Sequence, residues 1–179
     1  MRAHLLTNQM PVGVLYHYEL VVGADETGNG GTVIDRWSDH NLVPLVGVNY
    51  LANAMFGDIA PIGTWYLGLF LNNYVPSAGA TAADLPSVIG EFVGYSETTR
   101  PTWARVNTNG LWSNSASRAA FTCTQSARLY GGFLVSAATK GSGDGTLLSV
   151  ARFSSPKDVE VGMTLRVQGD LSLIPTAVV

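Results

Sequence analysis

Charged residues are scarce in this chain of 179 residues. Lys, Arg, Asp and Glu together make up 13% of the sequence, about half of the roughly 25% found in an average soluble domain. Hydrophobic residues make up 46%. A protein with so few charges either relies on Ser, Thr and Asn for its surface or covers much of that surface with neighbouring subunits. The second alternative predicts a component of a larger assembly.

Basic residues are few and scattered. The ten Lys and Arg are outnumbered by thirteen acidic residues, which gives a net charge of −3, and no two basic residues are adjacent. A sequence-independent nucleic-acid binder needs a broad basic surface, so nucleic acid is excluded as a partner of this kind. No apolar run approaches the ~18 residues of a membrane span, and the N-terminus lacks the continuous apolar core of a signal peptide. We therefore expect synthesis in a cytoplasm and no membrane partner.

The chain has one cysteine and three histidines. A single cysteine, Cys123, excludes an intrachain disulfide. No charged residue lies within four positions of it, so we expect a buried, inert thiol rather than a nucleophile of low pKa. His4, His17 and His40 lie in different predicted elements, and none has another His or Cys at the short spacing of a zinc site.

Motifs of catalysis and ligand binding are also missing. The glycine-rich stretches GADETGNGG (23–31) and GSGDG (141–145) superficially resemble calcium loops, but neither has several acidic ligands at alternating positions. No glycine-rich loop with a lysine joins a strand to a helix, and no G-x-S-x-G motif occurs. We predict no catalytic, cofactor-binding or metal-binding residues, no cofactor and no enzymatic activity.

Aromatic residues leave one alternative open. Trp65, Trp103 and Trp112 could line a platform for sugar rings, or they could fill a β core, since each buries a large apolar area. Non-catalytic carbohydrate binding therefore stays open as a function.

Most of the chain consists of short segments rich in β-forming residues between turn residues. They predict strands at 12–22, 33–37, 64–72, 103–107, 118–126, 128–137, 146–153 and 161–168, with an edge strand starting at 92–93. Gly68 suggests a close backbone approach, the pair Gly131-Gly132 a bulge or bend, and Gly169-Asp170 a turn. About seven to nine such strands are typical of a sandwich or barrel. We predict a mostly β, antiparallel, jelly-roll-like β-sandwich forming a single domain over residues 12–179.

One segment has a helical pattern. Apolar residues recur partly at helical spacing from Leu42, after candidate N-caps at 38–41 and with Pro44 in the first turn. Gly57 and Asp58 end the pattern. We predict the principal helix near residues 42–56.

Two stretches contain few residues that are expected to lie in the core. Residues 73–102 are predicted to be a long exposed loop, in which Thr81 and Asp84 resemble a capping box and Pro86 limits any helix to about one turn. Long loops in compact domains are usually functional or disordered, so we expect residues 73–102 to contact neighbouring subunits. Residues 1–11, which end at Pro11, are predicted to form an N-terminal arm over a neighbour.

Three pieces, in this order, resemble small structural proteins of tailed-bacteriophage virions. The first is a polar-capped helix of the form N-L-V-x-x-x-G-x-x-x-L (41–51). The second is an apolar strand with a small-residue loop, TWYLGLFLNNYVPSAGATAADLP (64–86), where such proteins present a variable surface. The third is the β-rich stretch V-x-V-G-M-T-L-R-V-x-G-D-L-S-L (159–173).

The resemblance implies a stoichiometric structural role in a virion that is assembled in the host cytoplasm. Our first prediction is a capsid decoration (cement) protein that bridges and stabilises neighbouring shell subunits. A tail, baseplate or fibre-attachment component is the alternative within the same class, and a carbohydrate-binding module is the alternative from another class. The implied partners are the major capsid protein or other virion proteins, and further copies of the chain in a homo-oligomer, for which a trimer is the expected form.

Overall fold

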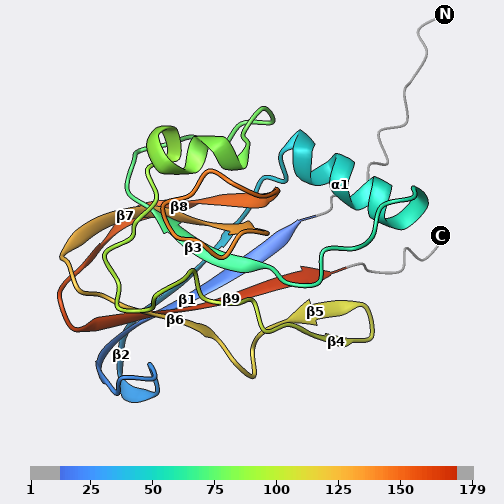
Figure 1. Cartoon of the computed structure of the whole chain (residues 1–179). Helices are drawn as coiled ribbons and strands as arrows, with labels where there is room; N and C mark the ends of the chain where they lie inside the picture. Colours follow the sequence, from blue (N-terminus) through green and yellow to red (C-terminus); the bar gives the residue numbers. More distant parts are fainter. Residues whose placement is uncertain (1–12, 173–179) are drawn as a thin grey trace, which may run out of the picture.

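The computed structural model describes residues 13–172, which form two antiparallel β-sheets packed against each other (Figure 1). Strands account for 46% of the residues and helices for 12%. The prediction of a mostly β antiparallel sandwich with one principal helix is confirmed. The predicted arm over residues 1–11 lies outside the described residues.

The larger sheet has six strands in the order β2-β1-β9-β5-β4, and β6 also pairs with β9. The strands are β1 (Val14–Ala24), β2 (Gly30–His40), β4 (Val106–Thr108), β5 (Leu111–Ser113), β6 (Ala119–Thr122) and β9 (Met163–Ser172). The short strands β6 and β5 share one edge of β9, since β6 pairs with residues 164–167 and β5 with residues 170–172. The strand β5 had not been predicted.

The smaller sheet has the order β3-β7-β8, with β3 (Tyr66–Phe70), β7 (Ala127–Val135) and β8 (Leu147–Val159). A register shift between Leu129 and Gly131 confirms the predicted bulge beside the glycine pair. β8 runs past the predicted end at residue 153 because the bulge lies opposite residues 153–156. Pro156 therefore has no partner in the register with β7, so its missing N–H breaks no ladder hydrogen bond.

The strand β9 passes through Gly169 and Asp170, where a turn had been predicted. Gly169 pairs with Tyr16 of β1. Its carbonyl accepts a hydrogen bond from the Trp103 indole at 2.9 Å, and its N–H donates to Asn114 Oδ1 at 2.8 Å. These tertiary contacts outweigh the local turn preference of the Gly-Asp pair, so the prediction of a turn was wrong.

The core has two parts, one on each face of the smaller sheet. Between the sheets, Tyr16, Tyr18 and Leu20 of β1 are buried, while the intervening His17 and Glu19 lie on the outer face. On the other face of the smaller sheet lies a second cluster, which consists of Phe70, Ala80, Ala82, Leu85, Ile89, Phe133, Val135, Leu147 and Val150. The smaller sheet is therefore covered on both faces.

The helix α1 (Leu45–Phe56) is the predicted principal helix, and it begins three residues later than expected. Leu42 instead forms a bridge with Val150 of β8, through two backbone hydrogen bonds of 2.9 and 3.0 Å. Gly47 is the one buried residue of the helix. A Cβ at this position would lie 2.6 Å from the Leu148 carbonyl oxygen, so the glycine lets α1 rest on β8.

Replacing Gly131 with alanine should lower the free energy of unfolding by about 1–3 kcal/mol, because overpacking forces shifts in a close-packed interior. The added Cβ would lie 2.1 Å from the Ala151 carbonyl oxygen and 2.3 Å from the Phe70 ring. Gly63→Ala is the matched control, since its Cβ meets no atom within 4 Å. Urea unfolding measures both variants, and equal stability of the two would contradict this close approach.

Candidate functional site

Residues 73–102 are not the long exposed loop that the sequence predicted. They pack on the outer face of the smaller sheet and bury Ala80, Ala82, Leu85 and Ile89 there. The predicted capping box is present: Asp84 accepts from the Thr81 backbone N–H at 2.8 Å at the start of the 3-10 helix η1 (Ala82–Asp84). A single-turn π-helix, η2 (Leu85–Ile89), follows. The four buried side chains are spread over ten residues and lie among small residues. The sequence of this segment therefore shows no clear apolar pattern from which its burial could be predicted.

The end of this segment covers the free edge of β3. The N–H groups of Leu67, Phe92 and Trp103 donate to the carbonyl oxygens of Pro101, Leu69 and Trp65, each at 2.8 Å. Apart from single bridges at Glu91 and Thr102, no regular strand forms here, so the predicted edge strand at 92–93 was wrong. β3 therefore offers no open edge to a partner strand.

A buried ion pair anchors the segment. Arg100 has no exposed surface and donates from Nε and Nη2 to the two carboxylate oxygens of Glu91, at 2.8 and 2.7 Å. The same guanidinium donates to the carbonyl oxygens of Ala137 and Ser142, and Glu91 accepts a further bond from the Gly141 N–H at 2.8 Å. Every charged atom of the pair thus has a partner, as a stable buried pair requires.

The turn at residues 139–145 is fixed to the same segment. Lys140 Nζ donates to the carbonyl oxygens of Tyr95 and Glu97 at 2.9 and 2.7 Å, and lies 4.3 Å from the centroid of the Tyr95 ring. The stretch GSGDG (141–145) contains three glycines, the residue with the greatest backbone freedom. The turn is nevertheless held in place, because Lys140 donates to two backbone carbonyls of the segment, and Glu91 and Arg100 bind the backbone of Gly141 and Ser142.

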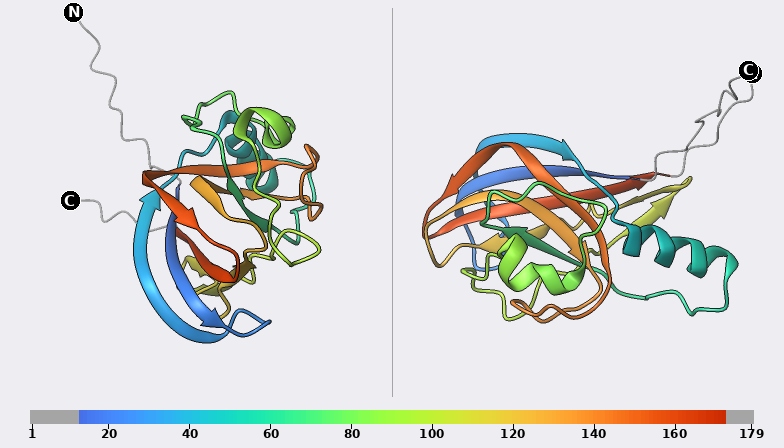
Figure 2. Two further views of the ribbon diagram at one scale, coloured as in Figure 1. Left: turned by 90° about the vertical axis from the view of Figure 1, so that its left-hand side faces the viewer. Right: turned by 90° about the horizontal axis from the view of Figure 1, so that it is seen from above.

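The helix α1 exposes an apolar surface. Leu45, Val48, Met55 and Phe56 are exposed, and the segment 41–57 contains no charged residue. The opposite side of the helix, with Tyr50 and others, packs on the body of the protein. Asn49 and Asn53 also lie on the exposed side, so this surface combines apolar side chains with two uncharged amides, and α1 projects from one end of the sandwich (Figure 2). This surface is therefore a candidate binding site for another protein.

Beside α1 lies an apolar groove with a volume of about 170 Å³. Its lining comes from α1, the following loop, and the strands and loops around β5 and β9: Tyr50, Leu51, Ala54, Met55, Pro61, Ile62, Trp65, Trp103, Arg105, Trp112, Leu148 and Leu171. The Arg105 guanidinium lies over the rings of Trp103 and Trp112, 5.3 and 5.6 Å from their centroids. Arg105 is the one charged residue of the lining.

The tryptophans do not form an open sugar-binding platform. Trp65 and Trp103 are buried in the floor of the groove, and Trp112 is half-buried beside them. The structure brings together the three tryptophans that the sequence singled out, but mainly as packing residues around α1. This grouping could not be predicted from the sequence, because the residues that meet in the fold are far apart in the chain.

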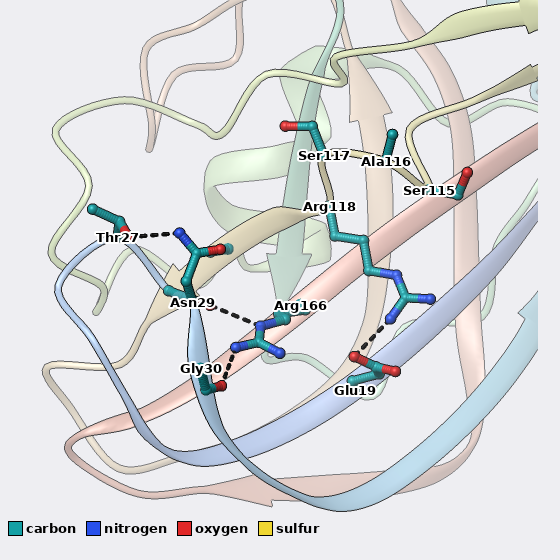
Figure 3. A pocket seen from close by; sticks show the side chains of 11 residues that line it. Glu19, Thr27, Asn29, Gly30, Ser115, Ala116, Ser117, Arg118 and Arg166 are labelled. Atoms are coloured by element: carbon teal, nitrogen blue, oxygen red, sulfur yellow. Dashed lines mark hydrogen bonds and ion pairs between the residues drawn. The ribbon is translucent and has the colours of Figure 1, made fainter.

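A polar hollow lies on the outer face of the larger sheet, between the β1–β2 turn and the loop before β6 (Figure 3). Its volume is about 370 Å³. Glu19 accepts from Arg118 at 2.6 Å and from Arg36 at 3.0 Å, and these hydrogen bonds lower the pKa of Glu19, with Arg118 as the larger cause. Arg166 donates to the carbonyl oxygens of Gly28 and Gly30. The hollow thus combines positive and negative groups without a single dominant charge.

A buried acid lies where β2 approaches β8. Asp39 Oδ1 accepts from the Ser154 N–H at 2.9 Å, while Oδ2 is buried with no hydrogen-bond partner among the described residues. Burial raises the pKa of Asp39 above its ordinary value. Nearby, Lys157 binds Asp35 at 2.7 Å and lies over the ring of Trp37.

Among the described residues, His17 lies on the outer face of the larger sheet and Cys123 lies in the core. His17 Nδ1 lies 2.8 Å from Ser38 Oγ, and Nε2 lies 3.3 Å from Asp170 on the outer sheet face. Cys123 is buried as predicted, and burial raises its pKa to about 11. Within residues 13–172, no group of three or more His, Cys, Asp or Glu could hold a metal ion. Over the same range, no helix has the length and hydropathy of a membrane span. His4 lies outside the described residues.

Comparison with known proteins does not assign this chain to a group: no family model matches it, and neither does any curated protein.

Replacing Arg100 with methionine should lower the free energy of unfolding by about 3–5 kcal/mol, because Glu91 would keep a buried charge without its partner. The double variant Glu91→Leu/Arg100→Met should regain part of this loss. Arg128→Met is the control, since it removes an exposed pair with Asp158 at 3.7 Å and should cost less than about 1 kcal/mol. Chemical denaturation gives the three values. Similar losses in both single variants would contradict the anchoring role.

The Asp39→Asn variant should change the pH dependence of stability. Because the pKa of Asp39 is raised in the folded protein, its ionisation opposes folding at neutral pH, and this penalty disappears as the pH falls through the folded pKa. Asp39→Asn should therefore gain stability relative to the wild type near pH 7 and lose this advantage near pH 4. The acids with lowered pKa, such as Glu19, titrate alike in both proteins and cancel in the difference. A difference that is constant with pH would contradict the assignment.

Proposed function

We propose that this chain is a structural protein of a tailed-bacteriophage virion, and that it decorates the capsid by binding neighbouring shell subunits. The observation that carries the binding role is the exposed apolar surface of α1. The virion context comes from the sequence resemblance at residues 41–51, 64–86 and 159–173. The proposed role is adhesive and stoichiometric, without catalysis.

The start of α1 is well placed to bind a shell. Leu45 and Val48 are exposed there, and the Leu45 N–H donates to the Ala78 carbonyl oxygen at 2.9 Å. The segment 73–102 therefore adjoins this end of the helix, and it exposes Val75, Val88 and Val93 on its outer side. Buried apolar area of this kind supplies much of the binding energy of permanent complexes. The expectation that residues 73–102 contact neighbouring subunits is kept, with these valines as the contact residues.

Rigid support favours such contacts. The ion pair of Glu91 and Arg100 and the bonds of Lys140 hold the segment on the sheet. A surface that is ordered before binding loses less conformational entropy on association. The contacts that hold residues 73–102 on the sheet should therefore also raise the affinity of this apolar surface for a partner.

The proposal predicts that purified particles contain this protein in a copy number proportional to that of the capsid subunits, and that isolated tails lack it. Gel densitometry of separated heads and tails measures both quantities. A tail, baseplate or fibre-attachment component would show the reverse distribution. In a binding assay with particles that lack the protein, Leu45→Asp/Val48→Asp should bind at least about ten-fold more weakly. Val161→Asp, at an exposed valine in the turn before β9, should bind normally.

The polar hollow favours a second candidate function, non-catalytic carbohydrate binding. Its volume of about 370 Å³ lies within the ~300–1,000 Å³ of small-molecule sites, and its arginines, Glu19 and the backbone groups of two loops can form hydrogen bonds with hydroxyls. Trp37 lines the adjoining hollow, so its fluorescence should change when a glycan binds. A flat response across a glycan panel would remove this candidate.

A further inference from the structure

The outer face of the larger sheet places positive charge on both sides of one carboxylate. Glu19 of β1 pairs with Arg36 of β2 on one side and with Arg166 of β9 on the other. Residues directly opposite each other in adjacent strands project from the same face of a sheet, so these three side chains form one row. Arg118, in the loop before β6, lies 2.6 Å from Glu19 (Figure 3). Three guanidinium groups therefore surround one acid.

Glu19 cancels only part of this positive charge. Its Oε1 accepts a hydrogen bond from Arg36 at 3.0 Å, and its Oε2 contacts Arg118, so both carboxylate oxygens are engaged. Within residues 13–172, Arg166 forms no ion pair with a carboxylate. Its Nε and Nη2 donate instead to two backbone carbonyl oxygens of the β1–β2 turn, which are neutral. The charge of Arg166 is therefore left without a carboxylate partner.

Two of these guanidinium groups keep N–H donors for a ligand. Arg118 donates from Nε to Gln168 Oε1 at 3.1 Å, and its Nη1 contacts Glu19. Among the described residues, Arg118 Nη2 and Arg166 Nη1 have no hydrogen-bond partner. Both arginines line the polar hollow on this face. Guanidinium N–H groups form their strongest hydrogen bonds with carboxylates and phosphates, so the hollow offers a site for an anionic group.

The turn that holds Arg166 is itself fixed. Gly28 packs closely on β6, because a Cβ at this position would lie 2.4 Å from the Ala120 Cβ. Asp25 Oδ1 accepts from the backbone N–H groups of Thr27 and Asn29, each at 2.9 Å. The two carbonyl groups that orient the β9 guanidinium therefore have defined positions. A binding group that is oriented in advance loses less conformational entropy when its ligand arrives.

The remaining lining suits hydroxyl groups better than apolar ones. It consists mainly of uncharged polar side chains and small residues: Thr27, Gly28, Asn29, Gly30, Ser115, Ala116, Ser117 and Ala120. The hollow has a volume of about 370 Å³ and shares Glu19 and Arg118 with the adjoining hollow of about 390 Å³. Each volume lies within the ~300–1,000 Å³ of small-molecule sites. A ligand larger than a single inorganic ion is therefore needed to fill this surface.

We infer that the polar hollow binds the carboxylate of an acidic saccharide, with the carboxylate at Arg118 and Arg166. The hydroxyl groups of the same sugar contact the uncharged polar side chains, and a neighbouring sugar unit extends into the adjoining hollow beside Trp37. This inference rests on the second candidate function, carbohydrate binding at the same hollow, and specifies the class of sugar. A neutral sugar would leave the charge of Arg166 without a partner.

Titration calorimetry and Trp fluorescence of the full chain test the inference. The probes are short oligogalacturonates and oligosialates, each compared with its own methyl ester, which keeps the sugar rings and removes the charge. The acidic forms should bind with a dissociation constant of roughly 10 μM–1 mM, and each ester should bind at least about ten-fold more weakly. Raising the salt concentration from about 50 to 500 mM should weaken only the binding of the acidic forms.

Variants identify the residues that bind the carboxylate. Arg118→Gln and Arg166→Gln should each weaken binding of the acidic forms at least about ten-fold. Arg128→Gln is the matched control, since Arg128 lies on the smaller sheet in an exposed pair with Asp158, and it should bind like the wild type. Glu19→Gln should strengthen binding at least about three-fold, because it removes the acid that competes for Arg118. A gain of affinity cannot result from misfolding, so this variant controls for a loss of structure in the others.

The outcomes separate this inference from the functions proposed above. Equal affinity for the acid and its ester, binding that is insensitive to both arginine variants, or binding of neutral glycans alone would overturn the inference and leave carbohydrate binding standing. No response to any acidic or neutral glycan would overturn both. The binding of α1 to a capsid shell is measured on particles, and none of these results changes it.

Discussion

The position of residues 73–102 on the smaller sheet depends on the buried ion pair between Glu91 and Arg100. It joins the segment 73–102 to the turn at 139–145, and it does so with two side-chain bonds between the partners and three further bonds to backbone groups. Removing two charges from water is costly, and only full hydrogen bonding makes such a pair tolerable. The pair therefore specifies one position of the segment over the smaller sheet, because any displacement would leave a charge unsatisfied.

Because residues 73–102 are held on the smaller sheet, they determine which surfaces of the protein are open to partners. A smaller sheet with an open face and an open β3 edge would be a general template for strand addition. Here the segment covers both, and exposed large apolar side chains remain on α1, on residues 73–102 and at single positions elsewhere. The exposed apolar side of α1 thus lies at one end of the sandwich (Figure 2), and the polar hollow lies on the larger sheet. A protein with two such separate surfaces can bind partners of different chemistry at the same time.

Several parts of the fold could be predicted because their cause is local. The alternation of buried tyrosines with His17 and Glu19 in β1 follows from the two-residue period of a strand. The capping box of Thr81 and Asp84 involves residues three positions apart, and the uncharged surroundings of Cys123 indicated its burial. Other parts could not be predicted. The groove beside α1 gathers Trp65, Trp103 and Trp112 from separate elements, and no spacing in the chain indicates that they meet.

The sequence by itself determined the class of fold, the position of the main helix and the shortage of charge. These properties are set by periodicity, by turn residues and by composition. The tertiary structure alone decided that residues 73–102 lie on the sheet rather than in solvent, because Arg100 finds partners up to 42 residues away. It also decided that β9 continues through Gly169, where Tyr16, Trp103 and Asn114 supply the contacts. Above all, it decided which side of the apolar helix α1 is left uncovered, because the packing of distant strands determines which face of the helix is buried.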